Sequence, residues 1–427
     1  MMTADCSRKL SRAWSNDLAT GSCKRVTDPV STFNFDLQPD RTGTSSTKWG
    51  KYAGRDILPF WVADMDFHTA PSILAALHAR LDHGVLGYTE APQGAIEAAQ
   101  TWLAREYGWA VAADWIVFIP AVVAGFNMAA HAVGERGDDV LVPVPVYHPF
   151  LHTPEHAGRS PLLVDLAAGD GRRWEMDFDR LQAAVTRRTR LLLFCNPQNP
   201  TGRVYTRPEV RRLAEFCLRN DIVICSDEIH CPLLLEPGAQ HIPIASLDRE
   251  IADASITLLA PTKAYNVPGV GCGVAIIPNA ALRTRYRDSR LGLVPSIGPL
   301  AYVATEAAWR DTSSWLPELL VYLRGNRDVL ADEIAALGLT VSHVEGTYLA
   351  WIDVRPLGLT DPGEYFEQQG LGLSNGAQFG RAGYVRFNFG CPRALLRAGL
   401  ERFAFAVRLC RGCCRCSGER EHALAGR

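Results

Sequence analysis

The sequence predicts an α/β protein with a large, doubly wound domain whose sheet is mainly parallel, followed by a smaller α/β domain. Short apolar segments alternate with helix-like segments through most of the chain, an order that is typical of parallel strands joined by helices. These apolar segments lack polar alternation, which favours strands that are covered on both faces. From about residue 300 the pattern changes to a long helical stretch, two strands and a closing helix, which indicates the second domain.

The individual elements can be placed on the sequence. Helices are expected at 71–83, which begins with Pro71, and at 121–133, which is bounded by a proline and a glycine. The smaller domain is expected to contain strands at 348–354 and 384–389. Short apolar runs predict the buried strands of the large domain at 139–144, 190–195, 222–225, 256–259 and 273–277.

The expected organisation divides the chain into five parts. Residues 1–40 are polar without an apolar period and are expected to be a poorly ordered extension. Residues 41–70 are expected to pack on the small domain, residues 71–300 to form the large domain, and residues 301–408 to form the small domain. Residues 409–427 hold four of the twelve cysteines and are expected to be a disordered tail. One pair of these cysteines has ligand-like spacing, but no second pair lies near, so incidental thiols are favoured over a metal site.

The composition excludes several classes of partner. The 44 Lys and Arg residues nearly balance the 46 Asp and Glu residues, so no attraction to nucleic acid or to anionic membranes is expected. No run approaches the about 20 apolar residues of a membrane span, and the N-terminal residues lack the apolar core of a secretory signal. Because six cysteines lie in or beside apolar segments, we expect reduced thiols and a cytoplasmic location. The expected partners are small molecules or further copies of the chain.

Polar side chains follow three of the predicted strands. Asn196 begins the segment NPQNPTG, Asp227 lies in SDEIH and Lys263 lies in APTKAYN. Ligands bind beyond the carboxyl ends of the strands in open parallel sheets, so these segments should meet at one crevice. Each segment alone has an ordinary explanation. NPQNPTG could be a turn, Asp227 a capping or ion-paired carboxylate, and Lys263 a solvated lysine. Together and in this order, they favour a ligand site.

A lysine, a carboxylate and a hydrogen-bond donor at one crevice match the needs of pyridoxal 5′-phosphate (PLP). The aldehyde of this cofactor forms a Schiff base with a partly desolvated lysine amine. A carboxylate against the pyridine nitrogen keeps that nitrogen protonated, so the ring withdraws electrons from the substrate Cα. A donor near O3′ tunes the imine, and N–H groups at the start of a helix suit the phosphate.

On these residues the sequence resembles the fold-type I PLP enzymes, the class I/II aminotransferases, and among them the MalY/PatB family of cystathionine β-lyase-like C–S lyases. The resemblance covers roughly residues 40–408 and implies a seven-stranded, mainly parallel sheet in the large domain. It rests on the segments RTGTSSTKW (41–49), LPFWVADMDF (58–67), GVLGYT (84–89), PVPVYHPF (143–150), NPQNPTG (196–202), SDEIHCPLLL (226–235), APTKAYNVPG (260–269) and YVRFNFGCPR (384–393).

The resemblance implies roles for the residues around the cofactor ring. Lys263 would hold the Schiff base and later transfer protons, Asp227 would pair with the pyridinium, and Asn199 would face O3′. His230 would lie near the ring, and Tyr147 would stack on its face. Taken singly, His230 could equally be a hydrogen-bonded histidine at a strand end, and Tyr147 an ordinary core or rim tyrosine.

The resemblance also implies contacts to the phosphate and to the substrate. The phosphate would lie at the helix start formed by Val122 and Val123, with Thr262 as a hydroxyl donor. Tyr88 would reach the phosphate of a second subunit, so a C2 homodimer is expected. Arg386 would bind the α-carboxylate of an amino-acid substrate as a bidentate fork, although a lone strand arginine is more often a solvated charge.

Two positions depart from the family pattern. Ala260 stands where the family often has a serine, and Gly271 stands where many aminotransferases place an arginine on the phosphate. The MalY-like branch commonly lacks this arginine as well, so the departure is compatible with the resemblance. We therefore expect backbone amides to contribute more of the phosphate binding.

The function implied by the resemblance is β-elimination from cystathionine or another cysteine S-conjugate, which yields a thiol, pyruvate and ammonia. Transamination on the same residues is the nearest alternative, because Lys263, Asp227 and Arg386 serve both reactions. A specialised lyase or aminotransferase of secondary metabolism is a further alternative. A regulatory protein that kept the fold is disfavoured by the intact lysine site and by the lack of a helix-turn-helix pattern in the first 40 residues.

Overall fold

The computed structural model describes residues 32–169 and 172–425, with side chains as far as Gly412. Most of the extension expected at residues 1–40 therefore lies outside the described residues. The described residues from Phe33 onward cluster as one compact unit, within which a large and a small sheet can be distinguished.

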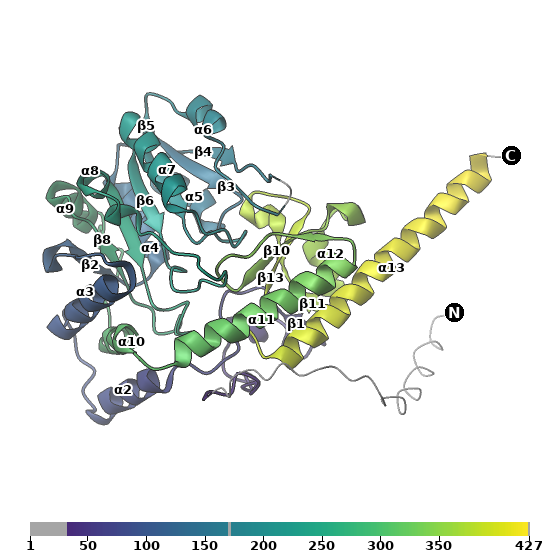
Figure 1. Ribbon diagram of the computed structural model, residues 1–427, viewed down its shortest axis with the longest axis horizontal. Coiled ribbons are helices and arrows are strands. Elements are labelled where there is room, and N and C mark those ends of the chain that lie inside the picture. Colours follow the sequence, from purple (N-terminus) through teal and green to yellow (C-terminus); the bar gives the residue numbers. More distant parts are fainter. Residues whose placement is uncertain (1–31, 170–171, 426–427) are drawn as a thin grey trace. The chain divides into compact units, whose positions relative to one another are not determined.

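The seven-stranded sheet confirms the predicted α/β class (Figure 1). Its strand order is β2-β8-β7-β6-β5-β3-β4, with parallel pairing from β7 to β4 and antiparallel pairing of β8 with both neighbours. The strands are β2 (Ile116–Ile119), β3 (Asp139–Val144), β4 (Ser160–Asp165), β5 (Thr189–Cys195), β6 (Val223–Asp227), β7 (Ser255–Leu259) and β8 (Gly273–Ile276).

Both faces of this sheet are covered by helices, which explains the continuous apolar strands. In β5, Leu191 and Leu193 pack in one core with α4 and α9, while Leu192 and Phe194 pack in another core with α7. The helices around the sheet are α3 (Gln93–Tyr107), α4 (Val122–Ala132), α5 (Pro149–His156), α6 (Phe178–Ala184), α7 (Arg207–Arg219), α8 (Arg249–Asp253), α9 (Ala280–Asp288) and α10 (Pro299–Arg310), and α2 (Pro71–Asp82) packs against α10.

A smaller antiparallel sheet follows in the order β12-β13-β10-β9. The segment before α2 packs against this part of the chain, since β1 (Leu58–Pro59) pairs with β11 (Leu371–Gly372) and Phe60 stacks on Phe387. The remaining elements are α1 (Thr47–Gly50), α11 (Trp315–Ala336), α12 (Pro362–Gln368), α13 (Arg393–Ala425), β9 (Thr340–Val341), β10 (Leu349–Asp353), β12 (Ser374–Asn375) and β13 (Tyr384–Asn388).

The closing helix α13 runs beside α11 and continues to Ala425, so the tail expected to be disordered has a helical backbone here (Figure 1). The reason lies in the residues that continue the helix, which include Arg, Glu, Ala and Leu but no proline. Extending an existing helix also costs less than starting a new one. Cys410, on the last described turn with side chains, is buried and its thiol donates to the carbonyl of Leu357 at 3.4 Å.

The cysteines of the body are buried and free, as the sequence predicted: Cys195, Cys217, Cys225, Cys231, Cys272 and Cys391. In the part of the chain that the structure describes, no group of three or more His, Cys, Asp or Glu side chains is arranged to hold a metal ion. Among the same residues, no helix has the length and apolar character of a membrane span.

Candidate active site

A cavity of about 540 Å³ lies beyond the ends of β5, β6 and β7. Five separate segments of the large domain contribute to it, together with the segment before α2 and residues 374–386 of the small domain. The cavity is lined by all but one of the predicted site residues: Lys263, Asp227, Asn199, His230, Tyr147, Val122, Val123, Thr262 and Arg386.

Asp227 is the last residue of β6. Its carboxylate is buried, and few interactions with the protein offset its desolvation. Burial raises its pKa to about 7, and the N–H of Ile229, which donates to it at 3.1 Å, and the nearby Lys263 offset this only in part. A buried carboxylate in this state gains most from a cationic partner in the cavity. A protonated ring nitrogen would supply such a partner.

Lys263 lies in the turn after β7 and projects into the cavity as a half-buried amine. Its Nζ donates a hydrogen bond to the carbonyl of Ala63 at 2.7 Å. Burial, and then the charge of Arg386, lower its pKa to about 8, while Asp64 and Asp227 act in the opposite direction. A lysine with this pKa is partly neutral near physiological pH, so it can attack an aldehyde or accept a proton.

Arg386 enters the cavity from β13 as a buried cation. Its Nη1 donates to Oδ1 of Asn199 at 2.9 Å, and its Nη2 donates to the carbonyl of Trp61 at 2.6 Å and to Oγ of Ser374 at 3.4 Å, so all three partners are neutral. Burial lowers its pKa to about 10. Among the described residues it forms no ion pair, and its Nε has no hydrogen-bond partner. A buried guanidinium without a counter-ion is suited to bind a ligand carboxylate.

The start of α4 forms another wall of the cavity. Its N-cap residue, Ala121, has an extended backbone and no side-chain group that could accept from the first N–H groups of the helix. The N–H groups of Val122 and Val123 therefore suit an anion, and the hydroxyl of Thr262 lines the same cavity.

Gly271 explains one departure from the family pattern. Its φ is +39°, and an added Cβ would lie 3.1 Å from the carbonyl oxygen of Pro120. A side chain at this position would be both strained and crowded, so the site is built without the arginine found in many aminotransferases.

Two aromatic side chains complete the cavity. Tyr147 packs edge-on against His148 with a centroid separation of 4.9 Å. His230 is buried, and its Nδ1 has no hydrogen-bond partner among the described residues. Burial, with Lys263 and Arg386 nearby, lowers the pKa of His230, so the ring is neutral. An unpartnered nitrogen beside the cavity is consistent with a polar ligand there.

Tyr88 is the predicted site residue that the single chain does not bring to the cavity. Its side chain is fully exposed, and Val85 and Leu86 beside it are also exposed. The sequence argument also missed several residues that line the cavity, namely Trp61, Val62, Ala63, His148, His152, Ser374, Gln378 and Phe379. Trp61, Val62 and Ala63 belong to the segment WVADMDF, which was identified as a family mark but without a role.

Comparisons with known proteins identify the family of the chain. Residues 55–403 match the sequence profile of the family described as aminotransferase class I and II. Cystathionine beta-lyase PatB of Bacillus subtilis (strain 168) is 37% identical over 390 residues, which cover 88% of this chain and 100% of PatB.

Solved structures give the same result. The crystal structure of OvoB is 45% identical with a TM-score of 0.85, and the match covers 88% of this chain and 99% of OvoB. The PLP-bound C-S lyase from Staphylococcus hominis is 30% identical with a TM-score of 0.82, over 88% of this chain and 99% of that enzyme. The chain therefore belongs to the class I and II aminotransferase family and, within it, to the MalY/PatB branch.

Proposed function

We propose that this protein is a PLP-dependent C–S β-lyase that acts on cystathionine or a related cysteine S-conjugate. The observation that carries the proposal is the meeting, in one cavity, of a lysine with a lowered pKa, a buried carboxylate and a buried arginine that has no counter-ion among the described residues. The names of relatives support it, since PatB is a cystathionine beta-lyase and the S. hominis enzyme is a PLP-bound C-S lyase.

The residues of the cavity fit PLP. Lys263 would hold its aldehyde carbon, Asp227 its ring nitrogen, and the amide of Asn199 its O3′. The N–H groups of Val122 and Val123 would hold its phosphate, assisted by Thr262. When bound, PLP withdraws electrons from the substrate Cα and so makes the Cα–H bond acidic.

The chain's own residues then account for binding and proton transfer. Arg386 would exchange its neutral partners for the α-carboxylate of the substrate, because a charged bidentate pair is stronger than bonds to an amide and a carbonyl oxygen. The neutral amine of Lys263 would take the Cα proton, and the Cβ–S electron pair would leave with the sulfur. One water is consumed overall, and the products are a thiol, pyruvate and ammonia.

The experiment that tests the proposal compares elimination with amino transfer. Purified protein loaded with PLP is incubated with L-cystathionine, and pyruvate is measured with and without an added keto acid. Pyruvate release without the keto acid is expected. Amino transfer that depends on the keto acid, with no pyruvate release, would make the protein an aminotransferase instead. A protein that shows no visible absorbance band after loading with PLP would contradict the cofactor assignment.

We also propose that the working unit is a C2 homodimer in the cytoplasm. The exposed segment around Val85, Leu86 and Tyr88 supports the dimer, since neighbouring apolar side chains gain from being covered. The buried free cysteines fit a reducing compartment.

Mixing two inactive variants tests the shared site. A dimer of Lys263→Ala and Tyr88→Ala chains contains one site in which an intact lysine meets an intact tyrosine of the partner subunit. Refolding the variants together at equal amounts should restore about a quarter of the sites. No recovery, with dimers present by light scattering, would show that Tyr88 does not act across the interface.

A further inference from the structure

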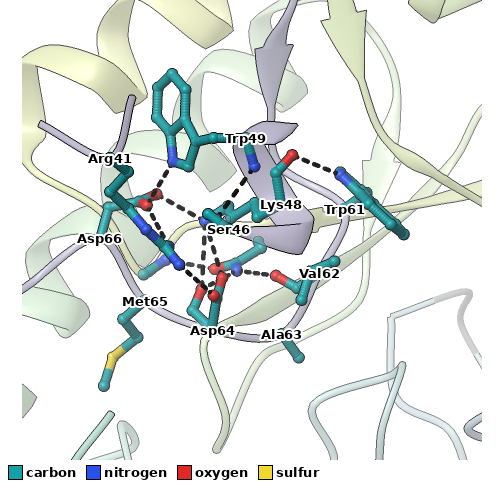
Figure 2. A network of polar contacts seen from close by, with 12 residues as sticks. Arg41, Ser46, Lys48, Trp49, Trp61, Val62, Ala63, Asp64, Met65 and Asp66 are labelled. Carbon is teal, nitrogen blue, oxygen red and sulfur yellow. Dashed lines mark hydrogen bonds and ion pairs between the residues drawn. The ribbon is translucent and has the colours of Figure 1, made fainter. Parts of the chain in front are cut away.

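Four charged side chains form a partly buried cluster beside the segment that carries Ala63 (Figure 2). Nη2 of Arg41 lies 2.8 Å from Oδ2 of Asp64, and its Nη1 lies 3.0 Å from Oδ1 of Asp66. Nζ of Lys48 lies 2.7 Å from Oδ2 of Asp66 and also donates to the carbonyl of Asp64 at 3.2 Å. We call these residues, Arg41, Lys48, Asp64 and Asp66, the charge cluster.

Global stability alone is a weak explanation for the charge cluster. Lys48 and Asp66 have side-chain exposures of 0% and 1%, so both charges have left water almost completely. The desolvation of such a pair often cancels its mutual attraction, and apolar side chains of similar volume can do as well. The presence of two cations and two carboxylates here therefore points to a role in the neighbouring segment.

The segment next to the cluster needs support from side chains. Trp61–Phe67 forms neither helix nor strand, so its carbonyl groups have no regular backbone partners. Instead the side-chain amide of Asn388 donates to the carbonyls of Val62 and Asp64, and that of Asn266 donates to the carbonyls of Met65 and Phe67. The position of this segment is therefore set by side chains that come from distant parts of the sequence.

Two carbonyl groups of this segment contact the machinery of the cavity. The carbonyl of Trp61 accepts from Arg386 at 2.6 Å. The carbonyl of Ala63 accepts from Nζ of Lys263 at 2.7 Å and from the hydroxyl of Tyr348 at 2.9 Å. Asp64, the next residue, lines a second cavity of about 560 Å³ together with Arg41, Asp66 and Lys263. Lys263 thus lines both the substrate cavity and a space that is also lined by Arg41, Asp64 and Asp66 of the charge cluster.

We infer that the charge cluster is a positioning element for the reacting lysine: it holds the Ala63 carbonyl against the Lys263 amine and fixes the Asp64 carboxylate beside that amine. The inference rests on the proposed function, in which this amine is the base. Asp64 and Arg41 have opposite effects on the amine, because the carboxylate stabilises the ammonium form and Arg41 neutralises the carboxylate.

The other charges around Lys263 define the background for this effect. Asp227 favours the ammonium form, whereas Arg386 disfavours it. His230 is close enough for its own pKa to be lowered by Lys263, and it is neutral. Since none of these side chains belongs to the cluster, substitutions of Asp64 and Arg41 leave them in place.

Opposite shifts in the pKa of Lys263 test the inference. Asp64→Asn is expected to lower this pKa by about half a unit to one unit, and Arg41→Gln to raise it by a similar amount. The readout is the rate at which trace acetic anhydride labels Lys263 in the cofactor-free protein as a function of pH, followed by peptide mass spectrometry. At pH 7, labelling should be about three- to fivefold faster in Asp64→Asn than in the wild type, and about three- to ninefold slower in Arg41→Gln.

A matched pair serves as the control. Arg283 and Asp114 are also 2.8 Å apart, but neither residue lines the two cavities. Arg283→Gln and Asp114→Asn should therefore leave the labelling profile of Lys263 unchanged. Because labelling needs neither substrate nor cofactor, a failed lyase assay would not affect this test.

Two outcomes would overturn the inference. In the first, the Asp64→Asn protein is less stable to heat but its Lys263 labelling profile stays at the wild-type pH. This result would make the charge cluster purely structural. The other is a shift in the same direction for Asp64→Asn and Arg41→Gln, which would indicate general loosening of the segment. Arg41 and Asp64 are 23% and 16% exposed, so folded variants are expected. If Arg41→Gln does not fold, Asp64→Asn decides the question alone.

Discussion

The two walls of the cavity are built in different ways. Asp227 is the last residue of β6 and Lys263 follows β7; these strands pair with each other and with further strands in the middle of the large sheet. On the other wall, the segment Trp61–Phe67 has no regular secondary structure and depends on the side chains of Asn266 and Asn388. The first wall is positioned by backbone hydrogen bonds, the second by side chains far away in the sequence.

The reacting groups and the groups that orient them therefore lie on different walls of the cavity. The sheet wall carries the groups that would hold the cofactor and transfer the proton. The irregular wall offers carbonyl groups and charges that orient those groups, as at Ala63 and Trp61. Substitutions on the sheet wall should therefore remove activity, whereas substitutions on the irregular wall should change its rate, its pH dependence or the stability of the fold.

The largest effect is expected at the centre of the sheet wall. Lys263→Ala removes both the amine that holds the cofactor and the base, so pyruvate release should fall by about three orders of magnitude or more. The measurement is steady-state pyruvate formation from L-cystathionine, with circular dichroism to show that the variant is folded. Turnover close to that of the wild type would assign the base to another residue.

Arg386 contacts both walls and should come next. Arg386→Ala removes a buried cation that would pair with the substrate carboxylate, so kcat/KM should fall by about 100-fold, mainly through a higher KM. Arg386→Lys keeps the charge but loses the fork geometry, and should recover only part of this loss. An unchanged KM in both variants would place the carboxylate elsewhere in the cavity.

The same difference explains what the sequence could predict. Parallel strands have their carboxyl ends at one edge of a sheet, so the order of the strands predicts that the residues at these ends lie close together. Asp227, Lys263 and the segment NPQNPTG were predicted in this way, and Asp227, Lys263 and Asn199 of that segment line one cavity. The buried strands were also predictable, because strands covered on both faces are apolar throughout.

The irregular wall was less accessible to sequence reasoning. The hydrogen bond between Lys263 and the carbonyl of Ala63 joins residues 200 positions apart. Because every residue has a carbonyl group, the sequence does not show which one accepts this bond. The segment WVADMDF was identified as a family feature. The role of its two acids, Asp64 and Asp66, follows only from their ion pairs with Arg41 and Lys48, which the sequence does not show. The contact of Tyr88 with a second subunit is likewise beyond what a single chain can show.

The pH dependence of the reaction links the two walls. Burial lowers the pKa of Lys263 to about 8, and the base must be neutral. The rate kcat should therefore rise by about tenfold per pH unit well below 8 and level off above it. Asp64→Asn should move this limb to lower pH, in line with its effect on the free amine. A limb that lies near the ordinary lysine pKa of 10.5 would show that the cavity does not desolvate this side chain.

The smallest effect is expected from a single hydroxyl that contacts the irregular wall. Tyr348 is buried and donates to the same Ala63 carbonyl as Lys263, at 2.9 Å. Tyr348→Phe keeps the ring and leaves the bond from Lys263 in place, so the free energy of unfolding should fall by about 1 kcal/mol. Activity should change by no more than about threefold, because the carbonyl keeps one donor. Denaturant unfolding and pyruvate assays on the same preparation measure both quantities. A loss of activity as large as that of Arg386→Ala would mean that the irregular wall takes part in the chemistry itself, and the distinction between the two walls would then fail.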